Sequence, residues 1–254
     1  MQKISAVVLT KNEEDRIERC LRSLDWVDEI IVFDSGSADK TCEIAKTFPN
    51  TKIIEQPGWG GFGKQRQISK DAAAHDWIFV VDADEEIPDN LRDEIQQKIS
   101  DNDLTKAYAV PRSAWVLGKK LKYCWYPDYI VRLYPKDKSY YKFEDLVYEQ
   151  VYFNSDIKVV KFKNPLWHFP YRNLNHFLEK SNNYAAAWAE KYFKAGKRTS
   201  LFQAIWHSAF CFFKNYFIKR GFLDGRRGFL IAILGAHSTF NKYACLLAKW
   251  WETS

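Results

Sequence analysis

The chain has 254 residues, 46% of them hydrophobic and 17% aromatic, which is enough for one large domain or for one domain with a sizeable addition. Its five cysteines are widely spaced and include no CxxC pair, which argues against a disulfide framework and against a zinc site. The net charge is +6, but residues 157–254 hold 16 basic and 4 acidic side chains, whereas residues 1–156 hold 22 and 28. The basic, aromatic part therefore predicts an anionic partner, such as a membrane surface, a phosphorylated glycan or a nucleic acid.

Apolar strand patterns and helix patterns alternate over the first 85 residues. We predict strands over 4–9, 29–34, 52–55 and 77–82, and helices over 13–24, from 39 onward and over 64–74. Thr10 or Asn12 is the expected cap of the first helix. The alternation is typical of a parallel α/β sheet. No GxGxxG motif follows the first strand and no GxxxxGK[ST] motif is present, so the pattern is not that of a dinucleotide fold.

Polar side chains stand where the predicted strands end. Asp34 and Asp82 each close a strand, Asp84 follows two positions later, and the polar run 10–13 follows the first strand. The carboxyl ends of parallel strands share one sheet edge, where ligands bind in open α/β sheets. Two convergent carboxylates at that edge require a cation or ligand hydroxyls, so we predict a site for a divalent metal and a nucleotide. The alternative is a buried strand that ends in a solvated acidic turn.

The pattern changes from about residue 106. Strands over 107–118 and 129–134 are expected to extend the sheet in a mixed or antiparallel manner, with Pro111 at an edge or a bulge. The irregular basic and aromatic segment 119–128 between them is a candidate acceptor loop, and a solvated charge cluster is the alternative. Three carboxylates in the segment 143–149 could supply a base near the metal site.

The remaining chain is predicted to be helical, over residues 173–195, 201–219 and 228–251. Its apolar runs are far shorter than the ~18–20 residues that a bilayer span needs. Trp206, Phe210 and Phe213 alternate with basic residues such as Lys214, which favours helices that lie on a membrane surface; a helical cap that packs on the sheet is the alternative. The N-terminus passes directly into a strand pattern without a cleavage region, which predicts a cytoplasmic protein.

These motifs together resemble those of family 2 glycosyltransferases with the GT-A fold. The motifs are Val-Val-Leu-Thr10-Lys11-Asn12-Glu13, the turn Asp34-Ser-Gly36-Ser37-Ala-Asp39-Lys-Thr41, and Asp82-Ala-Asp84. Residues 61–66, 132–134, 147–149, 180–182 and 221–225, together with His168, are similar to the lipopolysaccharide inner-core β-1,4-glucosyltransferases that act on heptose. The resemblance covers essentially the whole chain. It implies an α/β GT-A nucleotide-sugar domain with a mostly parallel sheet over 1–165, and a basic helical region over 166–254 that associates with the membrane and the acceptor.

The resemblance also implies a role for each site residue. The nucleotide-sugar site would contain Thr10, Asn12, Glu13, Asp34, Ser37, Lys64, Arg66 and Asp82. Thr10 and Asp34 would contact the base, Asp82 the ribose, and Lys64 or Arg66 the diphosphate or the base. Asp84 would bind Mg²⁺ or Mn²⁺, which neutralises the leaving UDP. Glu149, or alternatively Asp145, would deprotonate the acceptor hydroxyl.

The implied activity is an inverting, metal-dependent hexosyl transfer. The donor would be a UDP-sugar, namely UDP-glucose, and the acceptor a lipid-anchored glycan, namely heptose of the lipopolysaccharide inner core. The enzyme would be peripheral on the inner face of the bacterial inner membrane, with its basic helices on the anionic surface. The alternatives are a polyprenyl phosphate or another glycan as acceptor, or a non-catalytic membrane-surface binding protein. Nucleic acid is not expected, because the basic residues lie on amphipathic helices rather than in a reading motif.

Overall fold

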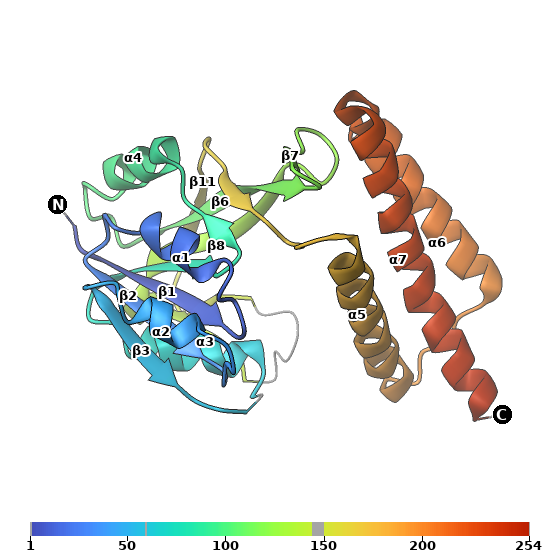
Figure 1. Ribbon diagram of the computed structural model, residues 1–254, viewed down its shortest axis with the longest axis horizontal. Coiled ribbons are helices and arrows are strands. Elements are labelled where there is room, and N and C mark those ends of the chain that lie inside the picture. The colour runs from blue at the N-terminus through green and yellow to red at the C-terminus, as the bar shows by residue number, and fades with distance from the viewer. Residues whose placement is uncertain (1, 59, 144–149, 254) are drawn as a thin grey trace. The chain divides into compact units, whose positions relative to one another are not determined.

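The computed structural model describes residues 2–58, 60–143 and 150–253 (Figure 1). The chain forms two compact units, Met1–Arg112 with Asp128–His168, and Ser113–Pro127 with Phe169–Ser254. The strands are β1 (Ile4–Thr10), β2 (Glu29–Asp34), β3 (Thr51–Glu55), β4 (Trp77–Asp82), β5 (Glu85–Glu86), β6 (Lys106–Val116), β7 (Lys119–Lys120), β8 (Asp128–Pro135), β9 (Ser139–Tyr140), β10 (Tyr152–Phe153), β11 (Lys158–Lys161) and β12 (Leu166–His168). The helices are α1 (Ile17–Arg22), α2 (Thr41–Ala45), α3 (Phe62–Asp71), α4 (Asp89–Lys98), α5 (Leu174–Lys194), α6 (Leu201–Phe213) and α7 (Gly225–Glu252).

The first unit is built on a mixed sheet with the strand order β3-β2-β1-β4-β8-β6-β12-β5, and β11 pairs with β6. The four strands of the predicted α/β pattern are parallel to one another. The later strands β8 and β6 continue the sheet in antiparallel pairs. The prediction of a mostly parallel sheet with a mixed extension is therefore confirmed.

Both faces of the central strands are buried, which explains their continuous apolar sequences. Successive side chains of a strand point to opposite faces. On β4, Trp77, Phe79 and Val81 belong to one hydrophobic cluster, whereas Ile78 and Val80 belong to another. The strand is thus held from both sides, and its last residue is fixed at the edge of the sheet.

Several helices differ from the predicted ranges. The helix expected over 13–24 is the shorter α1, and its N-cap is Arg16, which makes no side-chain cap hydrogen bond. Thr10 and Asn12 therefore do not cap it; Asn12 has a φ of 56° and lies in the loop before the helix. The pattern did not predict α4, in which only Leu91 and Ile95 are buried.

Pro111 was expected at an edge or a bulge. It lies within β6 opposite Tyr129, and β6 is an interior strand in the order of the sheet, not its edge. The irregularity of the strand lies between Tyr108 and Ala109, two residues before the proline. A proline that removes one donor is compatible with an interior strand next to such a register shift.

The second unit contains the long helices α5, α6 and α7, and α7 packs against each of the other two (Figure 1). Side-chain caps mark where the first two begin. The Asn173 side chain accepts the His176 N–H at the start of α5. Ser200 and Gln203 form a capping box at the start of α6. The helix expected over 201–219 ends as an α-helix at Phe213 and continues as the π-helical turn η2 (Lys214–Ile218).

Asp224 joins the two chain segments of the second unit. Its carboxylate accepts the backbone N–H groups of Lys122, Tyr123 and Cys124 at 2.9, 3.0 and 2.8 Å. A carboxylate that accepts several backbone donors makes strong, charge-assisted hydrogen bonds. The basic segment after β7 is therefore anchored to the residue that precedes α7.

Glycine is required at one position of α7 and not at another, which gives a test of this packing. A Cβ on Gly228 would lie 1.9 Å from the backbone oxygen of Gly221, whereas a Cβ on Gly235 would have no neighbour closer than 3.8 Å. We expect Gly228→Ala to cost roughly 3 kcal/mol and to lower the melting temperature by roughly 6–12 °C. Gly235→Ala is the matched control and should leave it unchanged or raise it, because alanine favours a helix. Thermal unfolding followed by circular dichroism measures both; equal melting temperatures would contradict the close approach.

Candidate functional site

Three neighbouring parallel strands deliver polar side chains to one edge of the sheet. β1 ends at Thr10 and β2 ends at Asp34, and the two residues are register partners. On the other side of β1, β4 ends at Asp82, whose register partner is Leu9. The structure thus brings together the strand ends that the sequence predicted to meet. Thr10 Oγ1 is buried and makes no hydrogen bond to any residue that the structure describes.

Asp34 organises the turn that follows β2. Its carboxylate is buried and accepts the N–H groups of Gly36 and Ser37 at 2.9 and 2.7 Å. It also accepts the hydroxyl of Ser37. Gly36 has a φ of 90°, a backbone conformation that favours glycine. The Asp-Ser-Gly-Ser motif is therefore a turn that its own aspartate holds in shape.

The loops after β1 and β2 are tied to each other. The Asn12 N–H donates to Ser37 Oγ at 2.8 Å, and the Ala38 N–H donates to Asn12 Oδ1 at 2.9 Å. The Glu13 N–H donates to Thr41 Oγ1 at 2.8 Å. Asn12, Glu13 and Ser37, which the sequence assigned to the nucleotide-sugar site, thus join the two loops beside the strand ends.

The Asp82 carboxylate lies between two buried arginines. Arg66 from α3 and Arg132 from β8 each donate from Nη2 to a different Asp82 oxygen. Arg132 Nη2 also donates to Glu85 Oε1 at 2.7 Å. Burial alone would raise the pKa of Asp82, but Arg132 and Arg66 hold that pKa well below its ordinary value. Asp82 is therefore a carboxylate at any physiological pH.

Glu85 is the fully buried member of this charge cluster, with 0% of its surface exposed. Its Oε2 accepts the backbone N–H of Asp82 at 2.9 Å, and Arg112 Nη1 lies 4.0 Å from its Oε1. Burial raises the pKa of Glu85, although the charge of Arg132 acts in the opposite direction. Glu85 therefore fixes the turn after β4 and orients Arg132.

Asp84 lies next to two side chains from distant parts of the sequence. Its Oδ2 is 3.7 Å from Arg16 Nη1 and 3.5 Å from His168 Nε2. His168 reaches it because β12 pairs with β5, which places His168 opposite Glu85 in the register. A carboxylate oxygen and an imidazole nitrogen at this separation are suitable as neighbouring ligands of one cation.

Lys64 lies in the first turn of α3, which begins at Phe62 after Gly61 with a φ of 86°. A Cβ on Gly60 would be 3.2 Å from Lys64 Cδ, so the glycine loop passes close to this lysine. The exposed N–H groups of a helix N-terminus and a lysine together favour an anion. This arrangement fits the diphosphate role predicted for Lys64.

The predicted bases Glu149 and Asp145 lie outside the residues that the structure describes. Four further residues at this edge, Glu85, Arg132, Arg16 and His168, were not predicted to have a role in the site. One signal was present, because Arg132 interrupts an otherwise apolar strand, Ile-Val-Arg-Leu-Tyr. A charged residue inside a buried strand needs a charged partner, but the sequence does not say which one.

Comparison with known proteins identifies the class of enzyme that this arrangement defines. The family model described as "Glycosyl transferase family 2" matches residues 5–114. An uncharacterized glycosyltransferase of Rickettsia typhi is 31% identical over 97% of this chain and 87% of its own length. The chain therefore belongs to glycosyltransferase family 2 and is a glycosyltransferase.

Two further proteins are similar to this chain over almost its whole length. The lipopolysaccharide core biosynthesis glycosyltransferase LpsC of Rhizobium meliloti is 25% identical over 93% of this chain and 89% of its own length. The structure of S. aureus TarS residues 1–349 in complex with UDP-GlcNAc has a similar fold, with a TM-score of 0.51 and 16% sequence identity. The similarity covers 100% of this chain and 93% of the TarS chain. The latter likeness is one of fold, and it confirms the GT-A architecture with a helical region after it.

Two features are absent from the described part of the chain. Within residues 2–58, 60–143 and 150–253, no helix combines the length and the apolar character needed to cross a bilayer. Over the same ranges, no three side chains of the His, Cys, Asp and Glu types are grouped as a ready-made metal site.

The charge cluster predicts a pH-dependent loss of stability in Arg132→Met. Removing one partner of a buried ion pair costs about 3–5 kcal/mol. Without Arg132 the folded-state pKa of Glu85 rises further above its unfolded value. The folded state then holds a proton that the unfolded state releases, so the free energy of unfolding of the variant falls as the pH rises from 5 to 8.

Urea denaturation at pH 5 and pH 8 measures this effect. Arg22→Met is the control, because Arg22 is 70% exposed and pairs only with Glu18 on the surface among its described ion pairs. Its effect should stay below about 0.5 kcal/mol at both pH values. An equal loss for Arg132→Met at pH 5 and pH 8 would show that Glu85 does not take up a proton.

Proposed function

We propose that this glycosyltransferase moves glucose from UDP-glucose onto heptose of a lipid-anchored lipopolysaccharide inner core, with inversion at the anomeric carbon. The observation that carries the proposal is the position of the Asp82-Ala-Asp84 segment. It follows β4 at the edge of the sheet where β1 ends at Thr10 and β2 ends at Asp34. The similarity to LpsC supports the lipopolysaccharide core as the acceptor class. Since the chain is a glycosyltransferase, the non-catalytic alternative is discarded.

The donor side of the proposal assigns binding to residues of this edge. Thr10, whose buried hydroxyl makes no hydrogen bond among the described residues, and Asp34 bind the base. Asp82 binds the ribose, and the two arginines keep it ionised and fixed. Lys64 and the first turn of α3 bind the diphosphate.

Asp84 is the proposed ligand of Mg²⁺ or Mn²⁺. His168, whose Nε2 is 3.5 Å from Asp84 Oδ2, would join it in the case of Mn²⁺, because Mg²⁺ takes oxygen ligands. Mg²⁺ commonly takes one or two protein carboxylates and fills its remaining positions with phosphate oxygens and water. When bound, the cation neutralises the charge of the leaving UDP. Arg16, at 3.7 Å from the same Asp84 oxygen, orients this carboxylate.

A carboxylate from the segment after β9 is proposed to deprotonate the heptose hydroxyl. We assign this role to Glu149, with Asp145 as the alternative. The oxygen then attacks the anomeric carbon from the side opposite to UDP, and the glycosidic bond to UDP breaks as the new bond forms. A single displacement of this kind inverts the configuration.

The metal assignment predicts that Asp84→Asn loses at least 100-fold in turnover while the protein still folds. The neutral amide removes the charge that the cation requires, and a 100-fold loss corresponds to about 2.7 kcal/mol of transition-state stabilisation. The measurement is UDP release from UDP-glucose with heptose-containing core lipid, with EDTA and with added Mn²⁺ or Mg²⁺. Asp93→Asn is the control, because Asp93 is 66% exposed on α4.

Full turnover by Asp84→Asn in EDTA would overturn the metal-dependent mechanism. The same assay tests the other specificities. Polyprenyl phosphate in place of the core lipid tests the alternative acceptor, and other UDP-sugars in place of UDP-glucose test the donor.

The outward face of α6 supports a membrane surface as a further partner. Phe202, Trp206, Phe210 and Phe213 share one helix face and are 74%, 61%, 50% and 50% exposed. The buried residue of this helix is the small Ala204. The usual arrangement, with large apolar side chains inward, is thus reversed. Large exposed apolar patches flanked by basic residues are typical of helices that lie in a membrane interface. We therefore propose a peripheral enzyme on the anionic inner face of the membrane.

Replacing two of these residues should weaken membrane binding. We expect Phe202→Glu/Trp206→Glu to reduce co-sedimentation with phosphatidylcholine–phosphatidylglycerol vesicles at least tenfold, since each aromatic side chain contributes about 1.5–3 kcal/mol when buried. Phe143→Glu is the control, because Phe143 is 56% exposed and lies in the first unit. Unchanged sedimentation of the double variant, or a wild-type dimer that the double variant abolishes, would assign this face to another partner.

A further inference from the structure

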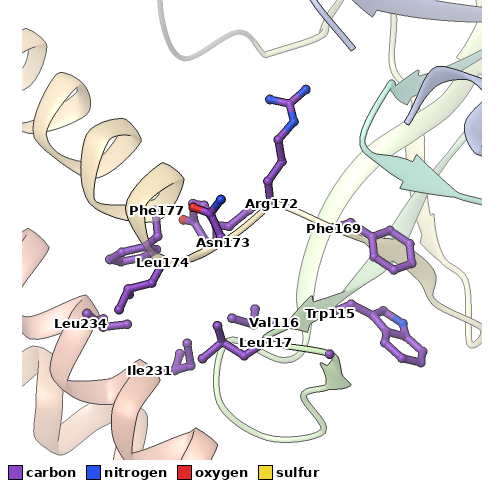
Figure 2. Close-up of a pocket in the computed structure, with 12 residues that line it drawn as sticks. Trp115, Val116, Leu117, Phe169, Arg172, Asn173, Leu174, Phe177, Ile231 and Leu234 are labelled. Atoms are coloured by element: carbon purple, nitrogen blue, oxygen red, sulfur yellow. The ribbon is translucent and has the colours of Figure 1, made fainter. Parts of the chain in front are cut away.

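The second unit contains an apolar pocket. It shares no residue with the strand-end site, which is the site that Thr10, Asp34, Asp82 and Asp84 form where β1, β2 and β4 end. It has a volume of about 150 Å³ and lies between the turn that joins β6 to β7, the segment around the start of α5, and α7 (Figure 2). Trp115 and Phe169 stack at a centroid distance of 5.8 Å. The apolar lining includes Trp115, Val116, Phe169, Phe177, Ile231 and Leu234.

The size and the lining of the pocket select a class of ligand. A dry apolar cavity of about this volume accepts a molecule the size of benzene, which is roughly six carbon atoms. Only Arg172 and Asn173 contribute charged or amide side chains to the lining. Asn173 Oδ1 already accepts the His176 N–H at 2.9 Å. A sugar ring needs several convergent polar groups, so the lining favours a hydrocarbon chain.

Two leucines indicate that such a chain can enter from outside. Leu117 and Leu174 line the pocket and are 41% and 40% exposed. On α7 the exposed Leu230 lies one helical turn before the lining residue Leu234, so the two side chains are neighbours on the helix surface. Apolar surface therefore continues from the pocket to the outside of the unit.

One positive charge stands at the rim of the pocket. The Arg172 side chain extends away from the apolar lining (Figure 2), so the residue at the rim is Arg227. Arg227 Nε donates to the backbone oxygen of the lining residue Leu117 at 3.2 Å. No acidic residue lines the pocket, and the second unit holds 16 basic and 4 acidic side chains. Of those four acids, Asp224 is occupied by backbone N–H groups.

We propose that this pocket binds the end of one hydrocarbon chain of an anionic lipid, whose phosphate lies against Arg227. The inference rests on the proposed function, because the lipid that it would hold during turnover is the anchored acceptor. An apolar pocket with a cationic side chain at its rim complements a molecule with a hydrocarbon tail and a phosphate. The site would select the acceptor by its lipid part, whereas the strand-end site selects the donor.

Short-chain phosphatidic acids test the pocket without a membrane. Below their aggregation concentrations, dibutanoyl and dihexanoyl phosphatidic acid are titrated into the full chain by calorimetry, with glycerol 3-phosphate as the headgroup alone. Each buried methylene strengthens binding about fourfold. We therefore expect roughly tenfold tighter binding of the dihexanoyl lipid than of the dibutanoyl lipid, and the weakest binding for glycerol 3-phosphate.

Two tryptophan variants then locate the binding site. Leu174 and Leu201 are each the first residue of a helix, directly after a side-chain N-cap, and they are 40% and 53% exposed. Leu174 lines the pocket and Leu201 does not. Leu174→Trp should weaken dihexanoyl phosphatidic acid binding at least tenfold, whereas Leu201→Trp should leave it unchanged. Arg227→Gln should weaken the binding of all three phosphates by a similar factor, because it acts on the headgroup.

The outcomes separate this inference from the proposed function. Equal affinity for glycerol 3-phosphate and for the dihexanoyl lipid, or an equal loss in both tryptophan variants, would overturn the pocket assignment. UDP titrated into the same proteins reports on the donor site by itself. A chain that binds the lipid at Leu174 but does not bind UDP would refute the proposed donor and leave the pocket in place.

Discussion

The ion pairs of Asp82 are the interaction on which the site at the ends of β1, β2 and β4 depends. This one carboxylate joins α3 through Arg66 to β8 through Arg132, and Arg132 continues to Glu85 after β4. The parallel strands, the antiparallel extension and the helix after the glycine loop thus meet at the end of β4. Two positive and two negative side chains balance one another in a largely buried place, so the loss of any one leaves an uncompensated charge. Such an arrangement fixes the edge of the sheet before any ligand arrives.

The parallel core was predictable because two patterns indicated it: strands and helices alternate along the sequence, and the strand sequences are continuously apolar. The sequence of β4 is apolar at every position before Asp82, and the two hydrophobic clusters on its faces explain why. The meeting of Thr10, Asp34 and Asp82 followed from parallel geometry alone. The partners that Asp82 and Asp84 find on later strands were not predictable, since Arg132 and His168 reach them through pairings between segments far apart in sequence. Arg66 was expected at the site, but its ion pair with Asp82 was not. Helix ends were also missed where no side-chain cap exists, as at Arg16.

The helical unit combines two kinds of apolar surface that a helix pattern does not distinguish. The spacing of large residues in α6 is that of an ordinary amphipathic helix, yet Phe202 and Trp206 face outward and Ala204 faces inward. Only the contact of α6 with α7 reveals which face is covered. The pocket is a separate feature, with its own lining and a basic residue at its rim. The proposed transfer from a water-soluble nucleotide donor to a lipid-anchored acceptor would use both kinds of surface.

The second unit is discontinuous in sequence, and this has a consequence for protein engineering. It takes residues 113–127 from the middle of the chain and 169–254 from the end, and Asp224 binds the two pieces through three backbone N–H groups. A chimera that exchanged only the C-terminal helices with those of a relative would separate Asp224 from the backbone that it holds. A truncated chain that ended at His168 would likewise leave those N–H groups without their acceptor. An exchange of the second unit between members of the family therefore has to move both pieces together.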